Sequence, residues 1–270
     1  IDKGAVCIVH TKPVENTRKG VAYIKVENVN NTLNILASKF YGYPSRKLKV
    51  FGVTGTNGKS TITSIIKDVY SHFEPCGYIG TISISYGDVV LPPSLTTPDA
   101  ILIHKTLKDM LDAKMKAVAL EVSSHGLELG RVQSVDFDVA IFSNLTYDHL
   151  DFHGTIENYF EAKKKLFTNL KPDGVAVLNM DDAYFERLKE ACSARVVTYG
   201  IEKDADYRGS EIQIGTDGSS FILYHDGKEY PVRTNLVAMY NISNLLAAIA
   251  AMAESGIPLE EILPYVNSLT

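Results

Sequence analysis

The sequence predicts an α/β protein with a mostly parallel β-sheet flanked by helices, a P-loop and a small antiparallel β region. Strand-like apolar runs alternate with helical patterns along most of the 270 residues, as in folds built from strand–helix–strand units. The runs are apolar throughout instead of alternating with polar residues, which is typical of strands covered on both faces. One run leads directly through a glycine-rich turn into a helix.

The expected elements follow from these patterns in chain order. The strands of the parallel part are expected at residues 48–54, 116–122, 138–143, 174–179 and 195–199. The helices are expected at residues 28–40, 59–73, 98–114, 155–170, 182–192 and 240–254. Alternating strands separated by Asp217-Gly218 and Asp226-Gly227 turns predict an antiparallel region at 205–234. A short strand pair is expected before the first helix.

The linker candidate is the proline-containing segment 41–47 (YGYPSRK). Residues 1–46 are too few for an independent domain, so we expect them to be the end of one, followed by a complete domain at 47–270. The first residue is Ile1 and not Met, and we expect the chain to be part of a longer protein.

Composition excludes several classes of function. Lys and Arg total 27 against 32 Asp and Glu, and the net charge of -5 argues against a broad nucleic-acid surface. Cys7, Cys76 and Cys192 are far apart and odd in number, which favours free thiols in a reducing cytoplasm. No apolar run approaches the roughly 18–20 residues of a membrane span. We therefore expect a cytoplasmic protein.

The segment 53–60 (VTGTNGKS) has the composition of a phosphate-binding loop. Its glycines let backbone N–H groups face an anion at a helix N-terminus, Lys59 would reach the outer phosphates, and Ser60 would bind Mg²⁺. The strict pattern has glycine where this chain has Val53, so the loop is a variant. The alternative is a glycine-rich turn with no ligand.

Two potential metal ligands follow apolar strands. Glu121 ends the run at 116–122, and His149 comes shortly after the run at 138–143. Ligands of open α/β sheets bind outside the carboxyl ends of the strands, so both side chains are expected near the phosphate loop. Taken alone, each residue is weak evidence, because a single His near a strand end is more often structural; together with the phosphate loop, the functional interpretation is favoured.

Lys163 lies on the apolar face of the helix expected at 155–170. At about 100° per residue, it coincides with the mean direction of the apolar side chains, whereas Lys164 lies on the flank and Lys165 points away. Those apolar side chains are Ile156, Tyr159, Phe160, Leu166, Phe167 and Leu170. A lysine in this position must be neutral, paired or modified, or else extend its ammonium group to water.

Six ordered motifs carry a family resemblance. They are TGTNGKS (54–60), Thr96-Thr97, EVSSHGLELGR (121–131), NLTYDHLDFHG (144–154), EAKKKLF (161–167) and NISN (241–244). On these motifs the chain resembles the Mur ligase family, and within it the branch that adds the third peptide residue in peptidoglycan synthesis. Folylpolyglutamate synthetases share the phosphate loop, but EVSSH followed by LELGR is similar to the muropeptide branch.

The resemblance implies a role for each matching residue. The implied ATP-binding residues are Gly55, Thr56, Asn57, Gly58, Lys59, Ser60, Thr61 and Asn241, with Asn244 as a further candidate. The implied Mg²⁺ ligands are Ser60, Glu121, His149 and a carbamylated Lys163. The implied muropeptide contacts are Thr96, Thr97, Ser123 and Arg131. The implied catalytic groups are Lys59, Glu121, His149 and Lys163. Ala238 stands where the family usually has glycine, which weakens the match around Asn241.

The resemblance also implies a reaction and a domain order. ATP would activate the dipeptide carboxylate of UDP-MurNAc-L-Ala-D-Glu as an acyl phosphate, which the amine of L-lysine or meso-diaminopimelate then attacks. Residues 1–46 would end a UDP-binding domain and 47–270 would be the central ATP-binding domain. The C-terminal amino-acid-binding domain would be absent, so this chain alone would be inactive. We expect a monomer.

Two other functions remain open. One is a related ligase with a different carboxylate acceptor, similar to cyanophycin synthetase, for which a separate ATP-grasp domain in the full gene would argue. The other is a non-catalytic nucleotide-binding module that retains the fold. The presence of Lys59, Glu121, His149 and Lys163 argues against that module.

Overall fold

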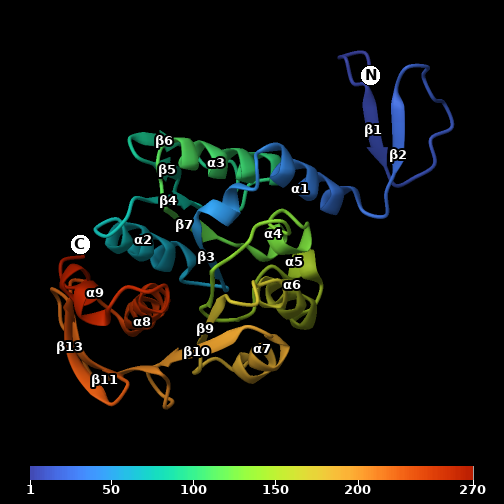
Figure 1. Cartoon of the computed structure of the whole chain (residues 1–270). Helices are drawn as coiled ribbons and strands as arrows, with labels where there is room; N and C mark the ends of the chain where they lie inside the picture. Colours follow the sequence, from blue (N-terminus) through green and yellow to red (C-terminus); the bar gives the residue numbers. More distant parts are fainter. Residues whose placement is uncertain (270) are drawn as a thin grey trace.

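The apolar strands of the chain come together in one 11-stranded sheet, seen in a computed structural model that describes residues 1–269 (Figure 1). In sheet order, the strands are β13 (Lys228–Thr234), β12 (Ser219–His225), β11 (Tyr207–Ile214), β10 (Arg195–Gly200), β9 (Val175–Asn179), β8 (Val139–Phe142), β3 (Lys49–Thr54), β7 (Ala117–Glu121), β4 (Cys76–Ile79), β5 (Ile84–Tyr86) and β6 (Val89–Leu91). The predicted α/β class is confirmed.

The middle of the sheet is parallel from β4 through β7, β3, β8 and β9 to β10. Each of the five predicted parallel strands is present within about one residue of its expected bounds. The predicted antiparallel region is also confirmed, because β11, β12 and β13 pair antiparallel, while β11 joins β10 in parallel. A second antiparallel extension, β4–β5–β6, was not predicted.

Helices cover both faces of the sheet (Figure 1). They are α1 (Val29–Phe40), η1 (Pro44–Lys47), α2 (Lys59–Tyr70), α3 (Ala100–Asp112), α4 (Ser124–Glu128), α5 (Leu150–His153), α6 (Ile156–Thr168), α7 (Phe185–Ala191), α8 (Met239–Glu254) and α9 (Leu259–Val266). All six predicted helices are present; the short α4, α5 and α9 were not predicted. Side chains of Asn28, Asp99 and Thr155 accept hydrogen bonds from the first turns of α1, α3 and α6, which explains why those helices begin there.

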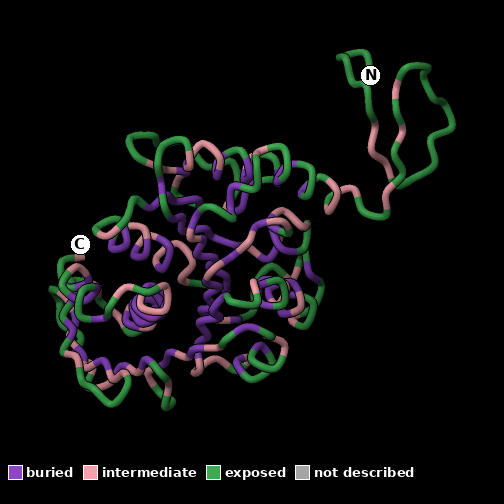
Figure 2. Tube along the Cα trace, viewed as in Figure 1, coloured by how far each residue is buried: buried purple, intermediate pink, exposed green. Residues whose placement is uncertain are grey.

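The two faces of the sheet carry separate hydrophobic clusters. One cluster contains apolar residues of α2, α8 and α9, and the other contains residues of α3, α6 and α7. Successive residues of β3 contribute to opposite clusters, as Phe51 and Val50 do. Figure 2 shows the buried residues along the central strands and the inner sides of the helices. Burial on both faces explains the continuous apolar runs of the sequence.

The N-terminal segment that carries β1 (Cys7–His10) and β2 (Ala22–Lys25) extends away from the rest of the fold (Figure 1). These two strands are the expected strand pair, and they form a separate parallel two-stranded sheet. The helix α1 then packs against α3. Across residues 1–269, every helix is too short or too polar to cross a membrane.

Strand order brings three carboxyl ends together. β3 lies between β7 and β8, with Val53 in register with Glu121 on one side and with Ile141 on the other. The loop after β3, the end of β7 and the segment after β8 therefore meet at one edge of the sheet. A ligand site of an open α/β sheet is expected at this place.

His104 on α3 is fully buried, and neither ring nitrogen has a hydrogen-bond partner among the described residues. Burial lowers its pKa from 6.5 to about 4, with a smaller opposing effect of Asp136. Below pH 6.5 the unfolded chain binds a proton that the folded chain does not, so acidification destabilises the fold. We expect this residue to lower the free energy of unfolding by about 2 kcal/mol between pH 7 and pH 5.

Urea unfolding of the chain and of a His104→Leu variant at both pH values measures this effect. The variant should lose about 2 kcal/mol less on acidification, because the carboxylates are common to both proteins and their contributions cancel. Equal losses in the two proteins would contradict the assignment to His104.

Candidate functional site

The phosphate loop is present between β3 and α2. Gly55 and Gly58 have φ values of 154° and 89°, which side-chain-bearing residues rarely adopt. A Cβ at Gly55 would collide with the Ser143 hydroxyl, and one at Gly58 would collide with the Asn244 amide. Val53 is buried inside β3, so the glycine of the strict pattern would fall within the strand and not in the turn.

The loop leaves the N-terminus of α2 free for an anion. Gly58 is the N-cap residue and provides no side-chain cap, so the first-turn N–H groups have no acceptor within the helix. Asn144, from the segment after β8, holds the other side of the loop: its carbonyl accepts from Thr56 N–H at 2.8 Å and its amide oxygen from Asn57 N–H at 2.9 Å. This arrangement suits a phosphate group.

Lys59, the first residue of α2, folds back over the loop. Its Nζ donates to the carbonyl oxygens of Gly55 at 2.9 Å and Thr56 at 2.8 Å. Burial lowers the pKa of Lys59, whereas the negative charges of Glu121 and Asp148 raise it. The net shift of the Lys59 pKa is downward, and the two carboxylates limit it.

Glu121 ends β7 and is completely buried. Its Oε2 accepts a hydrogen bond from the Ser60 hydroxyl at 3.0 Å. Its Oε1 accepts from the Tyr78 hydroxyl at 2.5 Å and from Thr81 N–H at 2.9 Å. The predicted proximity of Glu121 to the phosphate loop is therefore seen in the structure.

Lys163 on α6 is 1% exposed, so its ammonium group does not extend to water. Its Nζ donates to the Gly55 carbonyl at 2.7 Å and lies 4.4 Å from the centre of the Tyr159 ring. Burial, and next the positive charge of Lys59, lower the pKa of Lys163 well below its usual value. Its neighbours Lys164 and Lys165 instead form ion pairs at the surface. The predicted apolar-face position of Lys163 is confirmed.

His149 approaches the same place from the segment after β8. It has a left-handed φ of 50°, and its Nε2 lies 3.6 Å from a carboxylate oxygen of Asp148. Its ring is 5.0 Å from the His125 ring and 6.1 Å from the Tyr159 ring, centre to centre. His149 is exposed, unlike Glu121 and Lys163, which are buried. Its ring lies beside α6, the helix that carries Lys163.

Most of the predicted residues line one cavity of about 320 Å³. The predicted residues in its lining are Thr56, Asn57, Gly58, Lys59, Ser60, Thr61, Thr96, Glu121, Ser123, His149 and Lys163. Three further lining residues, Thr81, Ser124 and Tyr159, were not predicted as site residues. Tyr159 was visible in the sequence only as part of the apolar face of its helix.

Other predicted residues lie outside this lining. Thr97 is buried behind it, where its hydroxyl donates to the Glu121 carbonyl at 2.9 Å and its own carbonyl accepts from Arg131 at 2.9 Å. Asn241 donates to the Val237 carbonyl at 2.8 Å, whereas Asn244 is buried against Gly58. The structure therefore places Asn244, and not Asn241, beside the loop.

Ala238 is the N-cap of α8 and has φ 78° and ψ 145°. This region of backbone space is nearly restricted to glycine, and other residues are strained there. The backbone at Ala238 therefore has the conformation expected for the glycine that the family resemblance implies at this position.

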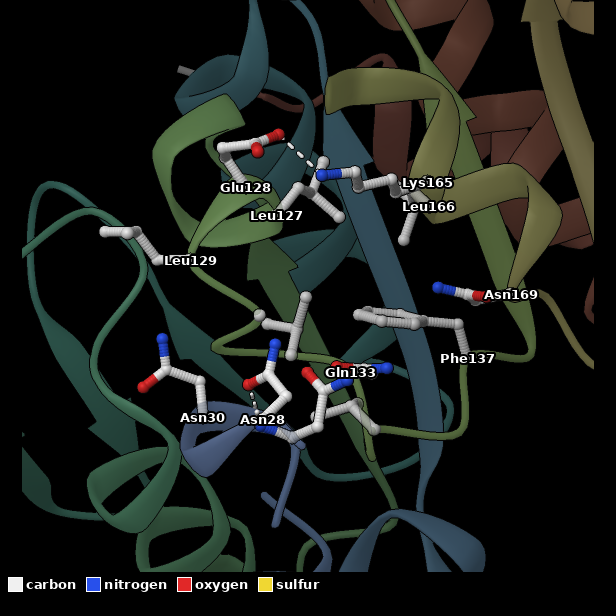
Figure 3. Close-up of a pocket in the computed structure, with 14 residues that line it drawn as sticks. Asn28, Asn30, Leu127, Glu128, Leu129, Gln133, Phe137, Lys165, Leu166 and Asn169 are labelled. Carbon is white, nitrogen blue, oxygen red and sulfur yellow. Dashed lines mark hydrogen bonds and ion pairs between the residues drawn. The ribbon is translucent and has the colours of Figure 1, made fainter. Parts of the chain in front are cut away.

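A second cavity of about 320 Å³ lies between the start of α1, the segment 127–137 and α6 (Figure 3). Amide side chains of Asn28, Asn30, Gln133 and Asn169 line it together with the Phe137 ring, and the Lys165–Glu128 ion pair lies on its other side. None of the residues predicted for the loop, metal or muropeptide lines it. It is a separate feature from the candidate site.

A parallel sheet, a glycine loop at a helix N-terminus and a lysine over that loop define an α/β domain of the P-loop class. The family model of the Mur ligase middle domain matches residues 53–252, and the chain belongs to the Mur ligase family.

Curated relatives and a solved structure that are similar to this chain support its assignment to this family. The chain is 43% identical over 278 residues to the UDP-N-acetylmuramoyl-L-alanyl-D-glutamate--2,6-diaminopimelate ligase of Lactiplantibacillus plantarum, covering 100% of this chain and 56% of the relative. It is 40% identical over 266 residues to the protein of the same name from Chlamydia pneumoniae, covering 98% and 55%. A solved structure with that name aligns with a TM-score of 0.83 and 32% identity over 94% of this chain and 53% of that one. The chain thus spans about half the length of these relatives.

Proposed function

We propose that the chain is the ATP-binding part of a ligase that adds the third amino acid to UDP-MurNAc-L-Ala-D-Glu in peptidoglycan synthesis. The observation that carries this proposal is the meeting of Lys59, Glu121, His149 and Lys163 at one cavity beside the phosphate loop. The names of the relatives support 2,6-diaminopimelate as the amino acid added.

In this proposal the phosphate loop binds the phosphates of ATP. The free N–H groups of the first turn of α2 and the ammonium group of Lys59 would stabilise the charge that develops during phosphoryl transfer. Asn244 is closer to the loop than Asn241, so we assign it the support of the loop and leave Asn241 as the candidate for contacts with the rest of the nucleotide.

The donor set fits Mg²⁺. Ser60 and Glu121 provide adjacent oxygen atoms of the kind that Mg²⁺ prefers, and phosphate oxygens would complete the set. No group of three or more His, Cys, Asp and Glu side chains in residues 1–269 is arranged to hold a metal without further ligands. When bound, Mg²⁺ would neutralise negative charge between the two anionic reactants, which are the phosphates of ATP and the carboxylate of the muropeptide.

We propose that Lys163 is carbamylated. Its ammonium group would lose one proton, and the resulting amine would add CO₂ with loss of a second proton. A buried cation would then become an anion with two oxygen atoms, at the cavity that His149 also lines. This change suits the site, because Lys163 is buried next to the positively charged Lys59 and no carboxylate hydrogen-bonds to it among the described residues. His149 and the carbamate would then provide further Mg²⁺ ligands.

The muropeptide would approach along Thr96 and Ser123, which line the cavity, while Thr97 and Arg131 hold these segments from behind. Its terminal carboxylate would attack the γ-phosphate of ATP, releasing ADP and giving an acyl phosphate. The amine of the incoming amino acid would then attack the acyl carbon and release phosphate. The protein would orient the reactants and stabilise charge.

The remaining expectations belong to the same proposal. Residues 1–46 would be the end of a UDP-binding domain and 47–270 the central domain, with the amino acid bound by a further domain. The full-length protein would act as a monomer in the cytoplasm.

Phosphate release by the full-length protein tests the function. Release should require ATP, UDP-MurNAc-L-Ala-D-Glu and the amino acid together. Release that is indifferent to the muropeptide would contradict it and favour another carboxylate acceptor. Binding of ADP with no release under any of these conditions would favour a non-catalytic module.

A further inference from the structure

The Glu121 carboxylate receives hydrogen bonds on both oxygens from β4 and the loop after it. The Tyr78 hydroxyl and Thr81 N–H donate to Oε1, at 2.5 Å and 2.9 Å. The Thr81 hydroxyl donates to Oε2 at 3.1 Å, next to the Ser60 hydroxyl at 3.0 Å. Rotation of the carboxylate would break these contacts, so they hold it in one orientation.

Between Tyr78 and Thr81, the two residues that donate to Glu121, position 80 has room only for glycine. A Cβ at Gly80 would collide with Glu121 Oε1 and would lie 2.5 Å from the Tyr78 hydroxyl oxygen. Gly80 N–H donates to the Ser83 carbonyl at 3.0 Å, which closes the turn that carries Thr81. Tyr78 is buried, so its hydroxyl is held beside the Glu121 carboxylate to which it donates.

Thr81 also contacts the muropeptide side of the cavity. Its hydroxyl oxygen lies 3.1 Å from that of Thr96. A hydroxyl has one proton, so when Thr81 donates to Glu121 it can accept from Thr96. Thr81 therefore joins the residue proposed to contact the muropeptide to the carboxylate proposed to bind Mg²⁺.

We propose that Tyr78 and Thr81 are positioning residues that hold Glu121 in the orientation in which it binds Mg²⁺ together with Ser60. The inference rests on the proposed function. It adds a role for β4 and the loop after it. Nothing in the sequence around Tyr78 and Thr81 indicates this role. Partners that hydrogen-bond a metal ligand typically contribute a factor of about 10–100 to metal affinity, so we expect about a 10-fold loss when either hydroxyl is removed.

The experiment measures Mg²⁺ affinity without turnover. A fluorescent ADP analogue at constant concentration is mixed with the full-length protein, and Mg²⁺ is titrated to find the concentration that gives half-maximal binding. Tyr78→Phe and Thr81→Val remove one hydroxyl each. Thr81→Ser keeps the hydroxyl, and Tyr86→Phe removes one from β5, outside the cavity lining.

The Mg²⁺ midpoint should rise about 10-fold in Tyr78→Phe and Thr81→Val and stay unchanged in the other two variants. Unchanged midpoints in both of the first variants would overturn the inference, whatever their melting temperatures. A rise in Thr81→Ser equal to that in Thr81→Val would overturn the role of the Thr81 hydroxyl. Binding to the unsubstituted protein that does not depend on Mg²⁺ would instead refute the metal site of the proposed function, and this inference with it.

Discussion

Replacement of Lys163 by alanine in the full-length protein is expected to lower phosphate release with both substrates by about a thousand-fold, the loss typical of a deleted charge-stabilising group. The reason is the position of Lys163, which is 1% exposed and has its Nζ 2.7 Å from the carbonyl of Gly55 in the phosphate loop. In the proposed function its carbamate provides the negative oxygen atoms that Lys163→Ala lacks. Short carboxylates such as acetate should restore part of the rate, because they can occupy the space left by the side chain.

Lys165→Ala is the matched control for this prediction. It lies on the same helix, and its side chain faces the surface in an ion pair with Glu128. Its rate should remain within about twofold of the unsubstituted protein, since exposed ion pairs contribute little. Full activity of Lys163→Ala would refute the carbamate, as would failure of carbon-13-labelled CO₂ to give a carbamate signal that depends on Lys163.

The parallel part of the fold could be predicted because its signals are local. Each central strand is an apolar run, and both of its faces are buried in the structure. Glycines at 55 and 58 marked the turn whose backbone requires them. The position of Lys163 on the apolar face followed from helical periodicity, since its direction coincides with the mean direction of the apolar side chains, whereas the burial of its ammonium group became clear only in the structure.

The β4 side of the site could not be predicted for a physical reason. β4 has only four residues, Cys76–Ile79, and one of them is Gly77, so the segment lacks the run of large apolar residues that marks the other buried strands. Tyr78 and Thr81 act on Glu121 only because β4 pairs with β7 in the folded chain. The spacing of these residues in the sequence does not predict their contact with Glu121.

Asn241 and Asn244 show a second limit of sequence patterns. Residues three apart lie on the same side of a helix, so the motif 241–244 does not distinguish the residue that faces the loop. The difference arises from the packing of α8 against α2, which buries Asn244 beside Gly58 and leaves Asn241 bonded to the Val237 carbonyl.

Lys59→Met in the full-length protein is expected to weaken ADP binding by about 10- to 100-fold, the cost of losing a charge-assisted hydrogen bond. Phosphate release should fall further, by about 100- to 1000-fold, because charge on the transferred phosphoryl group would lose a fixed positive partner. Methionine has a similar length and no charge, so the variant removes the ammonium group with little change in packing. Calorimetric titration with ADP and the phosphate-release assay measure the two effects separately.

Lys67→Met is the control for Lys59→Met, because Lys67 lies on the same helix but is half-exposed and pairs with Asp68 at the surface. It should match the unsubstituted protein in both assays. The fold should also tolerate Lys59→Met. The Thr56 carbonyl loses its lysine donor, whereas the Gly55 carbonyl loses the bond from Lys59 but keeps the one from Lys163. Equal ADP affinity in Lys59→Met and the unsubstituted protein would show that the loop does not use its lysine for phosphate. The expected result, a larger fall in phosphate release than in ADP affinity, would show that Lys59 stabilises the transition state more than the bound nucleotide.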